Sequence, residues 1–318
     1  MVDQEIERYA KHLGLHRPDV KRHLANAARS EAAAHIVKNI FRAKLRRAGR
    51  DPDDDQPFTD IVSEDQLGGD GVFIGTTTDA TQFIWRHGEI PYSCLAAGAP
   101  GTGKTTLALH LLLQLSRHYS VIIPDLRGDY EPLVRVLPNS RFLVIGRFPW
   151  NLLRGPRAVP PAVFYQTICE VFTDQFEQHQ ASRRYLSLIL DQLDAKRVQT
   201  GHSPCLLDLL DALEDRKEDR GSDELRFRNR CLARVDALCR AIGSESVGVE
   251  QGIDFEGLVE SGAAIIIRMD LERSIQDFIV NWLIAFVFAS RSSAEDKFSQ
   301  RPVIFLLDEQ RSILRTRR

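Results

Sequence analysis

Residues 98–105 read GAPGTGKT, and this short stretch limits the possible folds more than any other part of the chain. It fits the pattern G-x-x-x-x-G-K-[S/T] at every fixed position, with an apolar run before it at 90–97 and an amphipathic segment after it. Glycines at 98, 101 and 103 allow the backbone to curl so that its N–H groups point inward, where they bind phosphate oxygens at the start of a helix. The stretch therefore predicts a phosphate-binding loop between a strand and a helix.

The side chains of this loop predict ATP and Mg²⁺ as ligands. Lys104 is expected to neutralise the β- and γ-phosphates, and the hydroxyl of Thr105 is expected to ligate Mg²⁺. The predicted nucleotide contacts in the loop are Gly98, Ala99, Pro100, Gly101, Thr102, Gly103, Lys104, Thr105 and Thr106. A glycine-rich turn that only joins two elements is the competing interpretation, and it leaves the other fixed positions and the flanks unexplained.

A second apolar run, 303–307, ends in two carboxylates, Asp308 and Glu309. Such a pair alone is typical of an acidic strand end or a helix cap. Beside a phosphate-binding loop, however, Asp308 is expected next to Mg²⁺ and Glu309 is expected to accept a proton from the attacking water. The predicted catalytic residues are therefore Lys104, Asp308 and Glu309, and the predicted metal ligands are Thr105 and Asp308. Hydrolysis is favoured over nucleotide binding alone.

The run VIIPDLRGDY at 121–130 carries a third signal, Asp125 at the end of an apolar strand. A glycine turn and the pair Asp129-Tyr130 follow it. A turn capped by Asp125 explains the pattern on composition alone. Contact between Asp125 and the nucleotide is the other interpretation, and both stay open.

Apolar runs that alternate with helical segments predict an α/β fold, a RecA-like P-loop NTPase core with a mainly parallel sheet. The strand signals lie at 71–86, 90–97, 121–125, 140–146, 262–270 and 301–309. Residues 162 to about 250 instead place apolar side chains at three- and four-residue spacings, which predicts an all-helical insertion. The segment 274–290 is predicted to be a core helix.

The predicted domains are an N-terminal basic helical arm with an acidic linker (1–57), a first part of the ATPase core (58–157), the helical insertion (158–255), and a second part of the core (256–318). The second part contains the strand with the acidic pair, the Walker B strand. Residues 20–50 are rich in Lys and Arg, and DPDDD at 51–55 is typical of an exposed linker. Because no aromatic residues are interleaved with the charge, a solvated helix face is favoured over a contact with nucleic acid or a partner.

The composition of the chain mainly excludes certain kinds of site and certain classes of protein. The formal net charge of the 318 residues is -2, so the net charge of the whole protein neither attracts nor repels nucleic acid. The five cysteines are an odd number without a C-x-x-C pair, which signals neither a disulfide framework nor a zinc site. The longest apolar stretch, 278–289, is about half of the ~20 residues that a membrane span needs. We therefore expect a cytoplasmic protein with no membrane span.

The order of these segments resembles the HerA/FtsK superfamily, in particular HerA helicase-like proteins and the TraG- and TraD-like ATPases of conjugative transfer and type IV secretion. Members carry D-x-x-G-[DE]-Y after the second strand, as in Asp125, Gly128, Asp129 and Tyr130. Asn151-Leu152-Leu153 resembles their N-P-L segment, and 308–311 resembles their D-E-A-H-R box with Gln-Arg in place of Ala-His. The resemblance covers about 72–314. Because members continue with more sheet beyond the acidic strand, we expect the chain to be truncated after the Walker B strand.

The resemblance implies a homo-oligomeric ring, usually a hexamer, that binds ATP between subunits and drives DNA through its pore. The leading hypothesis is therefore an ATP-hydrolysing subunit of a DNA translocase or helicase motor. The alternative is an ATPase switch or assembly module that regulates a partner, such as a nuclease, an effector or a secretion component, without translocating DNA itself. A small-molecule P-loop kinase is disfavoured by the helical insertion and the strand order. A ring also implies an arginine that acts across subunits; Arg268, Arg273 and Arg291 are candidates by type only.

Overall fold

The computed structural model describes residues 4–15, 17–47, 70–76, 82–90, 94–99, 101–137, 139–176, 180–219, 221–293 and 301–308. The chain divides into two compact units, Met1–Leu67 and Gly68–Arg318. Several predicted features lie outside the described residues: the acidic linker 51–55, positions 91–93 of the strand expected before the loop, Pro100 of the loop, Glu309, and the Gln-Arg pair at 310–311. The predicted domain boundaries at 57, 157 and 255 stay predictions.

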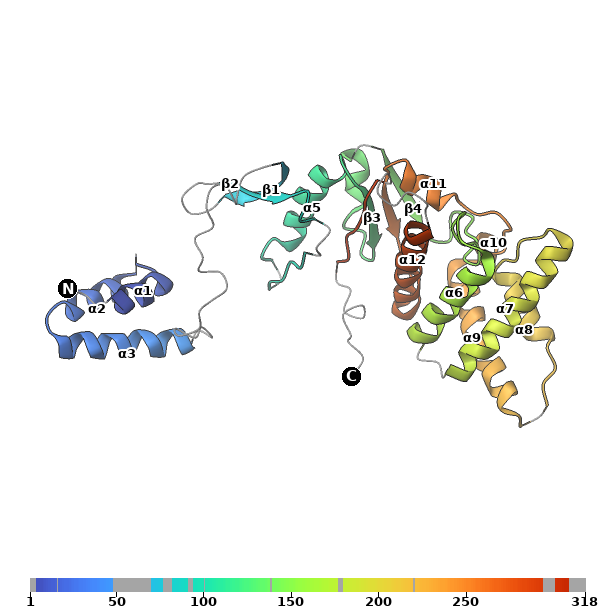
Figure 1. The fold of residues 1–318 in the computed structure, drawn as a ribbon, viewed down its shortest axis with the longest axis horizontal. Helices are drawn as coiled ribbons and strands as arrows, with labels where there is room; N and C mark the ends of the chain where they lie inside the picture. Colours follow the sequence, from blue (N-terminus) through green and yellow to red (C-terminus); the bar gives the residue numbers. More distant parts are fainter. Residues whose placement is uncertain are drawn as a thin grey trace. The chain divides into compact units, whose positions relative to one another are not determined.

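The first unit is helical and has its own core. Its helices are α1 (Gln4–Leu13), α2 (Pro18–Ala27) and α3 (Glu31–Arg47), drawn in blue in Figure 1. Pro18 stands in the first turn of α2, where its missing N–H leaves no hydrogen bond unmade. Apolar side chains at helical spacing, including Tyr9, Phe41 and Leu45, are fully buried between the helices.

An ion-pair network fastens α2 to α3. Lys44 Nζ lies 2.9 Å from Asp19 Oδ2, and Arg17 Nε lies 3.2 Å from Asp19 Oδ1. The hydrogen bond from Lys44 lowers the pKa of Asp19 to about 2, helped by Arg17. Part of the basic charge is therefore used inside the unit, while Lys21 and Arg22 are exposed.

The second unit is built on a parallel sheet. Its strands and its first helices are β1 (Gly71–Thr76), β2 (Gln82–Arg86), α5 (Lys104–Leu115), β3 (Ser120–Asp125), the 3₁₀ helix η1 (Glu131–Arg135), β4 (Ser140–Val144), β5 (Ala264–Arg268) and β6 (Val303–Phe305). Within the described residues the parallel sheet has the order β4-β5-β3-β6, and β1 and β2 pair separately as an antiparallel ribbon. The predicted α/β fold with a mainly parallel sheet is confirmed.

The remaining helices are α6 (Pro161–Gln175), α7 (Gln180–Thr200), α8 (Leu206–Asp215), α9 (Asp223–Ile242), α10 (Ser244–Val247), α11 (Phe255–Glu260) and α12 (Arg273–Ser293). Figure 1 shows α12 beside the sheet and α6 to α9 gathered next to it. The predicted core helix 274–290 corresponds to α12, whose buried side chains include Ile279, Trp282 and Leu283. Among the helices that the structure describes, none has the length and hydropathy of a bilayer span.

Alternating side chains of the central strands cover the two faces of the sheet. Val121 and Ile123 of β3 join Leu112 of α5 on one face. Ile122 of β3 and Ile265 of β5 join the helices α6 to α12 on the other. All six residues of β3 are buried, because a parallel strand that is covered on both faces needs apolar side chains on both.

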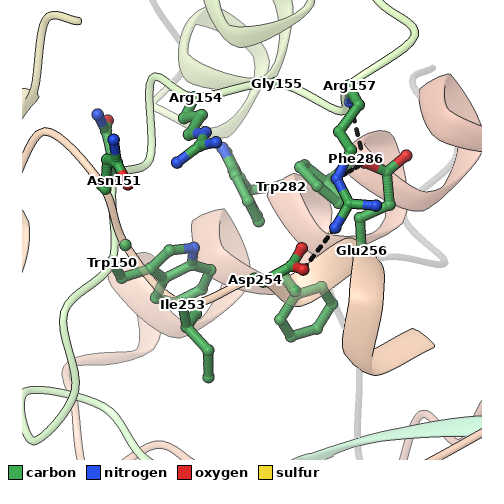
Figure 2. A pocket seen from close by; sticks show the side chains of 13 residues that line it. Trp150, Asn151, Arg154, Gly155, Arg157, Ile253, Asp254, Glu256, Trp282 and Phe286 are labelled. Atoms are coloured by element: carbon green, nitrogen blue, oxygen red, sulfur yellow. Dashed lines mark hydrogen bonds and ion pairs between the residues drawn. The ribbon is translucent and has the colours of Figure 1, made fainter. Parts of the chain in front are cut away.

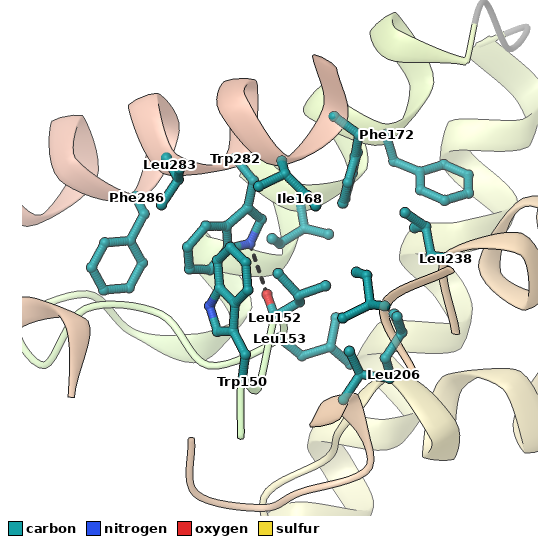
Figure 3. Close-up of a cluster of buried hydrophobic side chains, with 14 of the residues drawn as sticks. Trp150, Leu152, Leu153, Ile168, Phe172, Leu206, Leu238, Trp282, Leu283 and Phe286 are labelled. Atoms are coloured by element: carbon teal, nitrogen blue, oxygen red, sulfur yellow. Dashed lines mark hydrogen bonds between the residues drawn. The ribbon is translucent and has the colours of Figure 1, made fainter. Parts of the chain in front are cut away.

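The helical side has one large core with an aromatic centre. Figure 3 shows Trp150 and Trp282 in contact, with ring centroids 5.0 Å apart and nearly perpendicular. Trp282 also stacks on Phe286, and its indole Nε1–H donates to Leu152 O at 2.9 Å. The sheet and the helices that follow residue 158 therefore share a single hydrophobic core.

Candidate functional site

The phosphate-binding loop has the backbone that its glycines predict. Gly101 and Gly103 adopt positive φ of 79° and 88°, a region that residues with a Cβ rarely occupy. Gly98 has a different reason to be glycine: a Cβ there would lie 2.6 Å from Thr102 Oγ1. α5 begins at Lys104 directly after the turn, and Gly103 at its N-cap offers no side chain to accept from the first N–H groups. The start of α5 is thus a positively polarised end that suits an anion.

Lys104 folds back over its own loop. Its Nζ donates to Gly98 O at 2.9 Å and to Ala99 O at 3.0 Å, while Thr102 Oγ1 donates to Ala99 O at 2.8 Å. These are exposed hydrogen bonds, and a phosphate that accepts from the ammonium group can replace them at small cost.

The packing of α5 aims this loop at the carboxyl ends of the strands. Leu115 in the last turn of α5 belongs to a cluster with Ile304 at the start of β6. Leu109, nearer the first turn, belongs to a cluster with Ile123 and Leu306 further along the strands. α5 therefore runs antiparallel to β3 and β6, and its first turn faces the edge where Asp125 and Asp308 stand.

Asp125 organises the turn after β3. The residue is 1% exposed, and its carboxylate accepts backbone N–H groups from Gly128 at 2.8 Å, Asp129 at 3.1 Å and Tyr130 at 3.3 Å. This is the capped-turn interpretation that the sequence left open. The nucleotide contact predicted for Asp125 stays a prediction, with its carboxylate already engaged by three donors.

Tyr130 links this turn to the acidic strand. Its hydroxyl donates to Asp308 Oδ2 at 2.8 Å, and its side chain is buried. Burial, followed by the hydrogen bond to Asp308, raises the pKa of Tyr130 well above its usual value. The hydroxyl therefore stays protonated and holds Asp308 as a hydrogen-bond acceptor. Sequence reasoning quoted Tyr130 within a motif but missed this contact.

Arg268, the last residue of β5, lies at the same edge of the sheet. It is paired in register with Asp125, and its guanidinium forms ion pairs with Asp270 at 3.0 Å and Glu131 at 3.2 Å. Gly128 needs to be glycine beside it, because its φ is 86° and a Cβ would lie 2.8 Å from Arg268 Nη1. Of the three arginines that are candidates by type, Arg268 is thus engaged within its own chain.

Two sequence predictions need comment. The predicted strand before the loop is wrong for residues 94–97, which form no ladder and are exposed, Leu95 by 78%. The small side chains Ala96 and Ala97 bury little apolar area, and β6 is hydrogen-bonded to β3 alone within the described part of the chain. In those same residues no hydrogen bond or ion pair joins the loop to Asp308.

Metal-ligand clusters are also absent from the part of the chain that the structure describes: no group of three or more His, Cys, Asp or Glu side chains comes together. The Mg²⁺ ligands themselves stay predictions.

Asn151, the first residue of the predicted N-P-L-like segment, turns out to be structural. It is 3% exposed, and its amide donates to Pro204 O at 3.0 Å and Glu250 O at 2.9 Å. Its carbonyl oxygen accepts from Leu153 N at 2.9 Å. Asn151 therefore ties three distant segments together beside the Trp150–Trp282 pair.

Comparison with known proteins finds matches among solved structures. No family model matches the sequence, and no curated protein is similar to it. Among solved structures, the chain is similar to VirB4 of Thermoanaerobacter pseudethanolicus, with a TM-score of 0.49 and 15% identity. The match covers 70% of this chain and 64% of the VirB4 chain, so it spans less than two thirds of that protein.

Proposed function

We propose that this chain is the ATP-binding and ATP-hydrolysing subunit of a HerA/FtsK-like DNA translocase or helicase motor. The observation that carries the ATPase part is the start of α5, an uncapped helix end with a glycine turn and Lys104, aimed at the strand end that bears Asp308. Binding of phosphate at such a helix end follows from the free N–H groups and the helix dipole.

The residues present fit ATP with Mg²⁺. Thr105 lies in the first turn of α5, and Asp308 is half-buried with Oδ2 engaged by Tyr130, which leaves Oδ1 to face a hydrated cation. Bound Mg²⁺ would neutralise phosphate charge. Tyr130 fixes the orientation of Asp308 by its hydrogen bond, and Thr105 adds a hydroxyl oxygen.

The chain's own residues then divide the work of hydrolysis. Backbone N–H groups of the loop and Lys104 stabilise negative charge on the phosphates as it moves toward the leaving oxygen. Glu309, next to Asp308 in the sequence, orients the attacking water and accepts its proton. We propose a homo-oligomeric ring, for example a hexamer, because the family resemblance implies a nucleotide bound between subunits.

Contact with DNA is the most specific part of the proposal. It rests on the family resemblance and on the basic residues of the first unit, such as Lys21 and Arg22. Such contacts go to phosphates, so DNA affinity is expected to fall steeply with salt concentration.

A second candidate is an ATPase switch that regulates a partner protein without moving DNA. The observation that favours it is the independent core of Met1–Leu67, a compact helical unit that the ATPase fold does not require. In this version the helical unit docks the partner, for example a secretion component or an effector enzyme, and nucleotide state controls the complex.

Measured ATP turnover separates these proposals. The motor predicts turnover that double- or single-stranded DNA stimulates and that rising salt suppresses. Turnover that is indifferent to DNA and altered by a partner supports the switch. Glu309→Gln is expected to keep ATP binding and to lose turnover by about a hundredfold or more, whereas the exposed control Glu214→Gln keeps both. Unchanged turnover in Glu309→Gln would contradict the assignment of the base.

A further inference from the structure

Basic side chains are balanced by carboxylates in some parts of the molecule and are left unbalanced in others. In the pocket between 150–157, 251–256 and α12 (Figure 2), Arg157 is shared among the carboxylates of Asp254, Glu256 and Glu260. The charge of Arg157 is therefore satisfied within the protein. The first unit has the opposite balance.

The positive charge of the chain is concentrated in the first unit. Residues 4–47 contain eleven Lys and Arg and four Asp and Glu, which gives this segment a formal charge of +7. Because the whole chain carries -2, all the other residues together carry -9. A polyanion is therefore attracted to the helices α1 to α3 and repelled by the net charge of the rest of the chain.

Within this unit, unbalanced cations lie on the exposed face of α2 and of the two residues after it (Figure 1). Lys21, Arg22 and Arg29 are exposed there, together with the small side chains of Ala25 and Ala28. The three basic side chains make no hydrogen bond or ion pair in the part of the chain that the structure describes. We call these three residues the basic face.

Other charged groups near α2 are already engaged. Asp19 is the one carboxylate in α2, and it is bound by Lys44 at 2.9 Å and by Arg17 at 3.2 Å. Lys38 and Arg42 of α3 have partners as well. The basic face therefore remains available for an anion from outside the chain.

The surroundings of these cations indicate which kind of anion fits. None of the exposed large apolar side chains lies on α2, so an acidic helix or a membrane finds no apolar anchor there. Tyr9 and Phe41 of α1 and α3 are fully buried, so neither ring can stack on an unpaired base. A nucleic-acid duplex needs neither feature, because its phosphates lie on the outside and its bases are already stacked.

We propose that the basic face binds the phosphate backbone of duplex DNA, irrespective of base sequence. The side chains of Lys21, Arg22 and Arg29 donate charge-assisted hydrogen bonds to phosphate oxygens. These residues span about 12 Å along the helix axis, a length over which a duplex carries several phosphates. The choice of DNA rests on the proposed function, whereas the choice of a duplex rests on the surface itself.

Fluorescence anisotropy of a short labelled DNA duplex, titrated with the full chain, tests this surface. Three phosphate contacts predict that the logarithm of the affinity falls against the logarithm of the salt concentration with a slope of about -2.7, which is about fortyfold between 50 and 200 mM. A single strand of the same length is expected to bind about fivefold more weakly. Poly-glutamate of equal charge is expected to compete about tenfold more weakly than unlabelled duplex. Equal affinity for the single strand, or equal competition by poly-glutamate, overturns the proposal.

Variants locate the contact on the protein. Alanine at Lys21, Arg22 and Arg29 together is expected to weaken duplex binding about tenfold or more at low salt, and each single substitution is expected to make the salt slope shallower by about one. The melting temperature is expected to hold, because all three side chains are exposed.

The matched control removes the same charge from another surface. Alanine is placed together at Arg184, Lys196 and Arg230, which are exposed on α7 and α9 and make no ion pair in the described part of the chain. This variant is expected to bind the duplex as the wild type does. Equal loss of binding in the two triple variants would mean that overall charge, and not the basic face, holds the DNA.

Failure of the basic face can be told apart from failure of the motor. If the triple variant of the basic face binds the duplex with wild-type affinity while DNA stimulates wild-type ATP turnover, the basic face is wrong and the motor stands. If that variant loses the duplex while DNA leaves wild-type turnover unchanged, the basic face is right and the motor is wrong. A wild type that binds no duplex at low salt overturns the basic face directly.

Discussion

The two faces of the parallel sheet differ in how much apolar surface is packed against them. On the α5 face the apolar contacts form small clusters, and the loop before α5 is exposed and held by hydrogen bonds among its own atoms. On the helical face one continuous core joins the sheet to α6 to α12, with Trp150, Trp282 and Phe286 at its centre. Because stability follows buried apolar area, the helical face carries most of it, and the α5 face is left free to bind a ligand.

The largest loss of stability is expected when a large side chain is removed from the core on the helical face. Trp282→Ala removes a fully buried indole and leaves Leu152 O without its donor, so it should lower the free energy of unfolding by about 3–5 kcal/mol. Leu95→Ala, on the exposed segment before the loop, is the control and should change it by less than about 0.5 kcal/mol. Urea denaturation measures both. Similar losses in the two variants would mean that the faces do not differ as described.

Alkaline pH should lower the stability of the core on the same, helical face. Burial raises the pKa of the thiols of Cys169, Cys231 and Cys239 from an ordinary value of about 9 to about 12. Each folded thiol keeps its proton where the unfolded one has lost it. The stabilisation is therefore complete below pH 9 and is lost as the pH rises toward 12, by at most about 1.4 kcal/mol per pH unit for each thiol.

Urea titrations between pH 8 and 11 measure this loss. Alanine at Cys169, Cys231 and Cys239 together should flatten the pH dependence, although tyrosine ionisation still contributes above about pH 10. Alanine at the exposed Cys94 should leave the profile of the wild type. A profile that the triple substitution does not alter would show that these thiols titrate alike in the folded and unfolded chains.

A smaller effect is expected where the turn after β3 meets the acidic strand. Tyr130→Phe removes the hydrogen bond to Asp308 and should cost about 1–2 kcal/mol of stability. If Asp308 serves the proposed nucleotide site, ATP turnover should fall as well. Tyr119→Phe removes a comparable hydrogen bond to His87 and is the matched control, since turnover should not change. Equal turnover in the two variants would leave Tyr130 with a structural role only.

Local patterns account for what the sequence could predict. The runs 121–125, 140–146 and 262–270 became β3, β4 and β5, because a buried parallel strand is a continuous apolar run. Helical periodicity between 162 and 250 became α6 to α9 in the same way. The curl of the loop was also predictable, since Gly101 and Gly103 require positive φ for reasons that lie within the loop itself.

Contacts between distant segments account for what it could not predict. Tyr130 meets Asp308 across 178 positions, and Asn151 is bound to carbonyls 53 and 99 positions away. The indole N–H of Trp150 has no acceptor in the part of the chain that the structure describes, which no spacing in one sequence reveals. The strand expected before the loop is wrong at 94–97 for a related reason: pairing in a sheet needs a neighbour, and apolar composition alone does not supply one.

The most direct test of the account is ATP binding by the wild type, by Lys104→Ala and by Lys196→Ala, an exposed lysine on α7. Calorimetric titration with ATP and Mg²⁺ gives the affinities, and thermal melting checks the fold. Lys104 lies on the lightly packed face, so its loss should weaken ATP binding about ten- to hundredfold and leave the melting temperature unchanged, while Lys196→Ala binds as the wild type. Wild-type affinity for ATP in Lys104→Ala would contradict the assignment of the nucleotide site to the start of α5.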